Sequence, residues 1–446
     1  MSNSSSMQWA SALSTRPFLE AAITEAVEQA VAALQASWSG VGGDSEPREL
    51  ERPIPNVGFL FVSSAFASEY TRVLPLVQAK LAEAQIPAIP IVGCNGGGII
   101  GINTRGTARE VEDEAAVSLV LAVLPQVKVH PFYINPEQLP DLDGPPSVWS
   151  ELIGVDPQEI PQFIILADPF SSGINNLLSG LDYAYSECPK VGGIASSGVM
   201  NGQSGLFCGD RFYREGVVGV ALSGNIVMDT IVAQGCRPIG SPFQVLESER
   251  NVILKMQASD QDRSSSNGSP LEMLRDLIQW LSEEDKVLAQ TALFVGVAQS
   301  EFKQVLEPGD FLIRNLLGFD PRVGALAIGD RIRAGQRIQF HLRDAATSQE
   351  DLETLLRRYQ YPALEVDAKS VPKGEPKGAL MFACLGRGEA LYGEPNFDSQ
   401  LFSRYCNHIP MGGFFCNGEI GPVGANTYLH GFTASFGIFR PREAQG

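Results

Sequence analysis

The feature that most constrains the fold is a strand–helix–strand unit that recurs along the 446-residue chain. The first copy has an apolar strand at 58–64, a helix at about 68–84, a second strand at 88–92 and the glycine-rich loop GCNGGGIIG at 93–101. A second copy spans 163–198 in the same order, with FIILADPF before its helix and GGIASSG after its second strand. The repeated order predicts two similar local folds.

The helices of these two copies also share one apolar pattern, which is typical of helices that pack on a single face. Apolar residues fall at offsets 0, 3, 4, 7 and 11 in both helices: Tyr70, Val73, Leu74, Val77 and Leu81, and then Ile174, Leu177, Leu178, Leu181 and Tyr185. A third, looser copy consists of ALMFACLGRG at 379–388, a helix through Phe397 and Tyr405, and the loop PMGGFFCNGEIGP.

Crossovers of this length usually join parallel neighbouring strands with right-handed topology, so loops at equivalent strand ends are expected on one rim. Open α/β sheets bind ligands outside these ends. Between the copies, β-branched and alternating segments indicate further strands, and 324–344 indicates a hairpin with its turn at Ala334, Gly335 and Gln336. We predict an α/β to α+β fold, with two related mixed-sheet domains covered by helices.

Polar stretches predict the domain boundaries. The first 16 residues are typical of a frayed terminus, and the stretch ASDQDRSSSNGSP indicates a flexible loop. The predicted parts are an N-terminal helix and linker at 1–54, a first domain at 55–250, a flexible loop at 251–270 and a second domain at 271–440.

The composition excludes several function classes. The chain has 51 Asp and Glu against 33 Lys and Arg, a net charge of −18, which disfavours binding to nucleic acid or to anionic membranes. It has no apolar run of ~18 residues that could span a membrane and no secretory signal, so we expect a soluble, cytoplasmic protein. The seven cysteines lack a CxxC pair and the four histidines are widely spaced, so we expect no metal site and no cofactor.

The glycine-rich loops are the first candidates for ligand binding. GCNGGGIIG lacks the lysine and hydroxyl of a phosphate loop, but its backbone amides could form an anion-binding nest; the alternative is a tight turn. In the second copy, Ser196 and Ser197 are expected where the first copy has Asn95 and Gly96. Asp168 could contact a ligand amine or could serve as a carboxylate at a helix N-terminus.

The C-terminal segment FFCNGEIGPVGANTYLHGFTAS holds the densest set of reactive side chains, namely Cys416, Glu419, His430 and Thr433. A Cys–His pair oriented by the glutamate could supply a thiolate nucleophile. Ligand binding without catalysis and a buried structural cysteine are the alternatives. Upstream, Arg387 could bind a carboxylate through its planar guanidinium or could form a surface or interdomain ion pair.

Five blocks of the sequence resemble the FIST proteins, which carry an N-terminal and a C-terminal FIST domain in tandem. The blocks are GCNGGGIIG, FYREGVVGVALSG, QGCRPIGSPFQV, FLIRNLLGFDPRVGALAIGDRIRAGQRIQFHLRDA and FFCNGEIGPVG with LHGFTASF. The resemblance covers about residues 55 to 435, and the full RNLLGFD and FHLRDA blocks resemble the cyanobacterial and plastid-lineage branch.

The resemblance implies a sensory or regulatory protein that binds a small ligand such as an amino acid. In some eukaryotic relatives the FIST pair follows an F-box, but the helix and linker that precede the first block here are too short for an F-box. A free-standing sensor would act through a protein partner or by forming an oligomer.

The side chains expected at the rim of strand ends, or in the C-terminal segment that completes the third copy, form the predicted ligand-binding set: Ser63, Cys94, Asn95, Asp168, Ser196, Arg387, Cys416, Glu419 and His430. Glycine-loop amides and Arg387 would hold an anionic group, and Asp168 or Glu419 would hold an amine. We assign no catalytic residue. The alternatives are a thiol-dependent hydrolase that uses Cys416, His430 and Glu419, and a protein-interaction scaffold.

Overall fold

A computed structural model describes residues 6–39, 54–197, 204–259, 269–300, 303, 305–306, 308–361 and 374–442. The chain divides into two compact units, one made of residues 1–232 and 354–446, the other of residues 233–353. The predicted flexible loop at 251–270 therefore belongs to the second unit, and its residues 260–268 lie outside the described part, as do 40–53 of the predicted linker.

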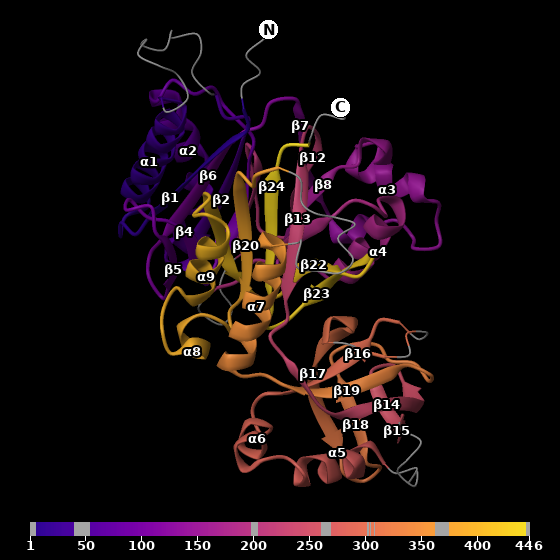
Figure 1. Ribbon diagram of the computed structural model, residues 1–446. Helices are drawn as coiled ribbons and strands as arrows, with labels where there is room; N and C mark the ends of the chain where they lie inside the picture. The colour runs from indigo at the N-terminus through magenta and orange to yellow at the C-terminus, as the bar shows by residue number, and fades with distance from the viewer. Residues whose placement is uncertain are drawn as a thin grey trace. The chain divides into compact units, whose positions relative to one another are not determined.

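The first copy forms the centre of a six-stranded mixed sheet in the first unit (Figure 1). Its parallel strands β2 (Val57–Ser63) and β3 (Ile91–Gly96) are joined by α2 (Tyr70–Glu83). The order is β1-β6-β2-β3-β10-β11, with β1 (Gln8–Ser14), β6 (Val117–Val123), β10 (Leu206–Gly209) and β11 (Arg211–Tyr213). The expectation of a frayed terminus is wrong for residues 8–14, because β1 pairs with β6 along its whole length.

Helix α1 (Leu19–Ser39) packs together with α2 on this sheet, as Figure 1 shows at the left. Its apolar residues Ile23, Val27 and Leu34 are buried in the same cluster as Val77 of α2. Burial of this helical face gives β1 a covered side, so the polar beginning of the chain becomes an ordered edge strand.

The second copy forms the centre of a second mixed sheet. Its parallel strands β8 (Gln162–Ala167) and β9 (Lys190–Ile194) are joined by α4 (Ile174–Ala184). The order is β23-β22-β9-β8-β12-β7, with β7 (Val127–Ile134), β12 (Val217–Gly224), β22 (Glu419–Val423) and β23 (Asn426–His430). The short helix α3 (Pro146–Ile153) packs with α4 in one apolar cluster.

The third copy forms the centre of a third mixed sheet in the same unit. Its parallel strands β20 (Gly378–Cys384) and β21 (Met411–Cys416) are connected through α8 (Glu389–Tyr392) and α9 (Phe397–Tyr405). The order is β13-β24-β20-β21-β4-β5, with β4 (Gly98–Ile102), β5 (Ala108–Glu112), β13 (Val227–Ala233) and β24 (Ala434–Arg440).

The three copies exchange hairpins in a cycle. The hairpin that follows the second parallel strand of each copy joins the sheet of another copy: β4–β5 joins the third sheet, β10–β11 the first and β22–β23 the second. The inner faces of all three sheets share one apolar core, which includes Phe61, Leu166, Val191, Phe382 and Phe414. The exchange therefore brings the ends of all three repeats to a common core.

One glycine in each copy fixes the structural alignment of the repeats. Gly93, Gly192 and Gly413 each pair with the parallel strand, and an added Cβ would lie 1.8 Å from the carbonyl oxygen of Leu60, Ile165 and Met381, respectively. No side chain fits at that distance, so glycine is required.

The alignment through these glycines corrects one expectation about the loops. Asn95 stands two residues after Gly93, and the residue two positions after Gly192 is Ile194. Ser196 therefore corresponds to Gly97 rather than to Asn95. The pattern of glycines alone does not show which glycine contacts the neighbouring strand. The expected match of Ser196 with Asn95 is therefore wrong by two residues.

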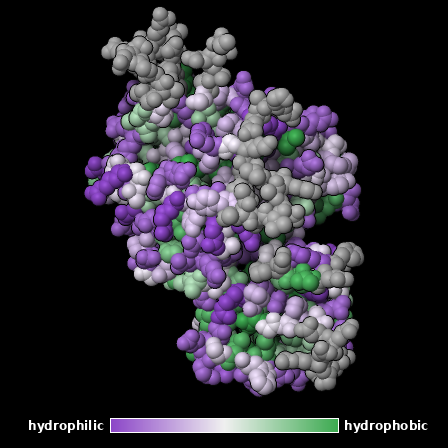
Figure 2. All heavy atoms as spheres, viewed as in Figure 1, coloured by the Kyte–Doolittle hydropathy of each residue, from purple (hydrophilic) through white to green (hydrophobic). Residues whose placement is uncertain are grey.

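The second unit is a closed antiparallel barrel with the order β14-β15-β18-β17-β16-β19. Its elements are β14 (Arg237–Glu249), β15 (Val252–Ala258), α5 (Pro270–Gln279), α6 (Glu283–Leu288), β16 (Leu293–Ala298), β17 (Phe311–Asp320), β18 (Ala325–Ile328) and β19 (Arg337–Leu342). The chain leaves the barrel within α7 (Ala345–Gln360). Figure 2 shows hydrophobic side chains on the surface of this unit, where Leu317, Phe319 and Val323 are exposed.

The hairpin expected at 324–344 is wrong. β18 pairs with β15 and β17, whereas β19 pairs with β14 and β16. The residues that connect β18 and β19 bind to β14 and to the turn after it: Gly335 N donates to the Val245 carbonyl and Ile332 N donates to the Arg250 carbonyl, both at 2.8 Å.

The α/β prediction with mixed sheets and two domains is confirmed, and the barrel is the antiparallel part. Among the described helices, none combines the length and the apolar character that crossing a membrane requires.

Candidate functional site

The ends of β3, β9 and β21 meet in the first unit. The Asn95 side-chain amide donates to the Ser196 carbonyl at 2.6 Å. The Ser196 hydroxyl accepts a hydrogen bond from Gly97 N at 2.8 Å and donates to the Phe415 carbonyl. Residues from all three copies are thus linked through Ser196, and the loops converge as the rim argument expects.

Cys416 lies at the centre of this junction. A Cβ added to Gly193 would lie 2.3 Å from the Cys416 Sγ atom, so the thiol packs directly on the β9 backbone. Ile194 N donates to the Gly418 carbonyl at 2.8 Å, and Asn417 N donates to the Ile194 carbonyl at 3.0 Å. We call the junction of Asn95, Ser196 and 415–418 the strand-end junction.

The inner side of the strand-end junction is apolar. Cys94 and Cys416 are fully buried in the core cluster that also contains Phe61, Phe382 and Phe414. Burial raises the pKa of both thiols well above their usual range, and for Cys416 the charge of Glu419 acts in the same direction. A nucleophilic cysteine needs a lowered pKa, so this environment does not favour the hydrolase alternative.

We expect Cys416 to resist alkylation in the native protein. With iodoacetamide at neutral pH, Cys416 should remain unmodified during the time in which the partly exposed Cys236 is labelled completely. Both cysteines should react in denaturant, because unfolding exposes the thiols and restores their usual pKa. Peptide mass mapping measures both outcomes. Rapid labelling of Cys416 in the native protein would contradict this expectation and would favour the thiol-dependent hydrolase.

The C-terminal hairpin adds buried polar groups beside the junction. Glu419 of β22 and His430 of β23 are cross-strand partners, and both are almost completely buried, at 0% and 3% exposed. The Glu419 Oε2 atom accepts a hydrogen bond from Thr433 N at 3.1 Å, and the His430 Nε2 atom donates to the Gly421 carbonyl at 3.0 Å. The structure therefore brings Glu419, His430, Thr433 and Cys416 together.

The position of Glu419 is polar only in the third copy. In the sheet register Glu419 pairs with Gly193, and the equivalent hairpin residues are Ile99, which pairs with Phe414, and Leu206, which pairs with Cys94. Ile99 and Leu206 are both fully buried core residues. A carboxylate thus occupies a place that the other two copies fill with aliphatic side chains.

Ser63 and Asp168 occupy equivalent positions at the ends of the first parallel strands. The Ser63 hydroxyl accepts a hydrogen bond from Ala116 N at 3.1 Å. The Asp168 carboxylate accepts hydrogen bonds from Phe170 N at 2.8 Å and from Gly216 N at 2.6 Å. These contacts favour local backbone roles for both side chains.

Arg387 forms a buried ion pair. Its Nε and Nη2 atoms donate to the two carboxylate oxygens of Asp398 at 2.5 and 2.9 Å, and both side chains are at most 1% exposed. The bidentate geometry favours an ion pair over ligand binding, but the pair is buried within the first unit, so the expected surface or interdomain location is wrong. Sequence reasoning missed Asp398 and also Glu110, which lies beside it. An arginine followed by an acidic residue in the next helix was the available signal for Asp398.

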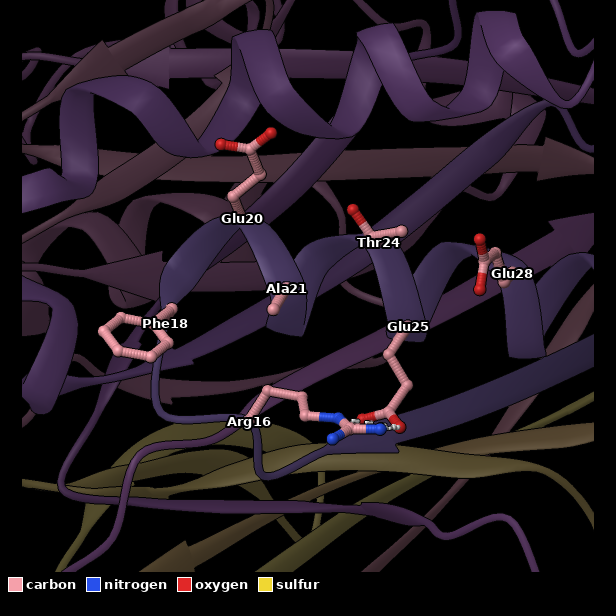
Figure 3. Close-up of a pocket in the computed structure, with 7 residues that line it drawn as sticks. All are labelled: Arg16, Phe18, Glu20, Ala21, Thr24, Glu25 and Glu28. Carbon is pink, nitrogen blue, oxygen red and sulfur yellow. Dashed lines mark hydrogen bonds and ion pairs between the residues drawn. The ribbon is translucent and has the colours of Figure 1, made fainter.

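The surface pocket drawn in Figure 3 is formed by a part of the chain that contains none of the residues described above. It has a volume of about 510 Å³ and is lined by Arg16, Phe18, Glu20, Ala21, Thr24, Glu25 and Glu28, at the start of α1. Arg16 and Glu25 form an ion pair across it, at 3.2 Å. None of the predicted site residues lines this pocket. Among the described residues, no group of three or more His, Cys, Asp or Glu side chains is arranged to hold a metal ion.

Comparison with known proteins identifies the family. The family model of the FIST N domain matches residues 56–258, and that of the FIST C domain matches residues 270–422. An uncharacterized protein of Mycobacterium tuberculosis is 32% identical over 88% of this chain and 93% of its own length. An uncharacterized protein of Mycobacterium bovis is 34% identical over 62% of this chain and 67% of its own. An Arabidopsis thaliana F-box/LRR-repeat protein is 33% identical over 22% of this chain and 17% of its own. The chain therefore belongs to the FIST family, with a FIST N and a FIST C domain in tandem.

Proposed function

We propose that this protein is a small-ligand-binding sensor that recognises an amino acid or a similar small metabolite. The observation that supports this proposal most is the buried Glu419 carboxylate beside His430 at the strand-end junction, in a position that is aliphatic in the other two copies. The sensor acts in the cytoplasm and transmits ligand binding to a protein partner or through a change in oligomeric state.

The energetics of burial support a functional carboxylate. Transfer of an ionised group into the protein interior is costly unless an opposite charge and hydrogen bonds compensate it. Ile99 and Leu206 show that the fold accepts an aliphatic residue at this position. A ligand ammonium group at this carboxylate would add a charge-assisted hydrogen bond to the contact that Thr433 N already makes.

The glycine-rich loops supply the complementary chemistry. Backbone N–H groups in loops of this kind can bind a carboxylate, as anion nests do. The turn between β3 and β4 is Gly97, flanked by Gly96 and Gly98, and the turn between β21 and β22 consists of Asn417 and Gly418. In this proposal the amine of the ligand contacts Glu419, and its carboxylate takes the place of the Ser196 hydroxyl as the acceptor of the Gly97 N–H group.

The substitution Glu419→Gln tests the proposal. Calorimetric titration of the wild type with a panel of amino acids and amines should identify a ligand, and the variant should bind it about ten- to a hundredfold more weakly because a charged hydrogen bond is lost. Glu151→Gln on the exposed face of α3 is the matched control and should bind normally. If the folded wild type binds no member of the panel at millimolar concentration, the proposal fails.

A further inference from the structure

Two thiols occupy neighbouring positions at the ends of parallel strands. Cys384 is the last residue of β20, Cys416 is the last residue of β21, and the two are register partners. Phe382 and Phe414, two residues earlier on the same strands, are also partners, and their rings contact each other edge to face with centroids 5.9 Å apart. Because side chains alternate along a strand, Cys384 and Cys416 share the face of these rings.

The spacing of the strands allows a covalent link. Neighbouring strands lie about 4.8 Å apart, which falls within the range of Cα separations that disulfides bridge, about 4.4 to 6.8 Å. Facing Cβ atoms on adjacent strands are farther apart than the disulfide optimum of about 3.8 Å, so closure needs a small local adjustment. Both cysteines end their strands, where such an adjustment is easiest.

The two thiols differ in exposure, so an oxidant from solution can react with one of them before the other. Cys384 is partly exposed and Cys416 is completely buried. The proximity of Cys384 contributes to the raised pKa of Cys416, which agrees with the short distance that the register implies. An oxidant from solution would therefore meet Cys384 first.

The thiol pair is specific to the third copy. Ser63 and Gly96 occupy the corresponding register pair of the first copy, and Asp168 occupies the position of Cys384 in the second. The fold therefore does not require sulfur at these two positions, so we look for a chemical role of the two cysteines.

We propose that Cys384 and Cys416 form a reversible disulfide in response to a hydroperoxide. The Cys384 thiol loses its proton, and the thiolate attacks a peroxide oxygen; the O–O bond breaks, a sulfenic acid forms, and the hydroxide that leaves takes up a proton and becomes water. The Cys416 sulfur then attacks the Cys384 sulfur, the S–O bond breaks, and the hydroxyl leaves with the Cys416 proton as a second water. In total, two thiols and one peroxide give one disulfide and two waters.

Bridge formation would alter the strand-end junction. The Cys416 Sγ atom packs on the backbone of Gly193, so a bond to Cys384 would shift this sulfur against β9. This movement disturbs the contact between the loops of the second and third copies. If the ligand binds at the strand-end junction, which rests on the proposed function, oxidation would regulate the affinity of the protein for this ligand. A bridge between adjacent strands is strained and hence easily reduced, as regulatory disulfides are.

Peroxide titration of the purified full-length protein tests the bridge without any ligand. The number of thiols measured in denaturant should fall from seven to five, and non-reducing peptide mapping should identify a Cys384–Cys416 link that dithiothreitol reverses. The substitution Cys384→Ser should abolish this loss of two thiols. Cys236→Ser, which removes another partly exposed cysteine, should leave it unchanged.

Other products would overturn the proposal. Oxidation of Cys384 to sulfinic acid while Cys416 remains a free thiol would do so, and so would a bridge between Cys94 and Cys416. Binding is measured separately: a bridge that forms without changing the affinity of an identified ligand disproves regulation of the site but leaves the redox chemistry intact. A protein that binds no ligand yet forms the bridge disproves only the proposed sensor.

Discussion

Replacement of Glu110 by glutamine is expected to stabilise the protein increasingly as the pH rises. Glu110 of β5 is 4% exposed, and its Oε1 atom accepts a hydrogen bond from Ser399 N at 2.7 Å. Burial, together with the nearby charges of Asp398 and Glu112, raises the pKa of this carboxyl from 4.5 to about 8. The native protein therefore holds a proton on Glu110 that the unfolded chain releases between these pH values.

The sign of the effect follows from this difference in bound protons. Stability falls with rising pH wherever the native state binds more protons than the unfolded state. For Glu110 the loss begins near pH 4.5 and is complete above a pH of about 8. At 1.36 kcal/mol per unit, the wild type loses up to about 5 kcal/mol from this group over the window. The glutamine of the variant does not titrate in this pH range. The negative charge of Asp398 also favours the N–H group of the glutamine amide over a second carboxylate.

Urea denaturation at about pH 5, 7 and 9 measures the effect, with the fluorescence of the buried Trp9 and Trp149 as the probe of the first unit. The advantage of Glu110→Gln over the wild type should grow with pH and then level off. Glu114→Gln, an exposed position after β5, is the control and should show no such trend. A variant that is less stable by a constant amount at every pH would mean that an ionised Glu110 is required.

Replacement of Asp398 by asparagine should cost about 3 to 5 kcal/mol of unfolding free energy. The change keeps the shape of the side chain but leaves the guanidinium of Arg387 buried without its counter-charge, which is among the most destabilising single changes known. Tyr392 also loses a charged acceptor, because its hydroxyl donates to the Asp398 carboxylate at 2.8 Å. The same change removes a negative charge beside Glu110, so the pKa of Glu110 should fall and the pH dependence of stability should weaken.

Two comparisons make this result interpretable. Glu159→Gln removes the partner of an exposed lysine, Lys128, whose side chain is 75% exposed, and should cost at most about 1 kcal/mol. The double variant Arg387→Met and Asp398→Leu should recover part of the loss, since apolar residues can replace a buried ion pair. An Asp398→Asn protein as stable as the wild type would show that the pair is not energetically coupled to folding.

The local elements could be predicted from the sequence because their signals are local. The repeated offsets of Tyr70, Val77 and Leu81 predict a helix at about 68–84, and the structure has α2 at Tyr70–Glu83. The FIILAD stretch predicts a strand, and β8 covers Gln162–Ala167. The hairpin exchange could not be predicted, because pairing partners depend on contacts between residues more than a hundred positions apart, such as Ile420 with Gly192.

The candidate site was predictable only in part. Strand-end position correctly indicated that the loops near Asn95, Ser196 and Cys416 meet. The partner of Arg387 was only weakly indicated, because an acidic residue in the next helix does not by itself show that the connecting segment brings Asp398 to the guanidinium. The buried surroundings of Glu110 were equally hidden, since the alternation in AREVE suits an exposed strand as well as a buried one.

The cyclic exchange of hairpins has a consequence for how such a protein can be shortened or rebuilt. Removal of any one repeat would take the β-ribbon away from one remaining sheet and would leave the ribbon of the other remaining repeat without its host sheet, so a single deletion would disturb both remaining repeats. Engineers seeking a minimal receptor should therefore treat the three repeats as one indivisible ring, and should redesign specificity by point changes at the closure of that ring.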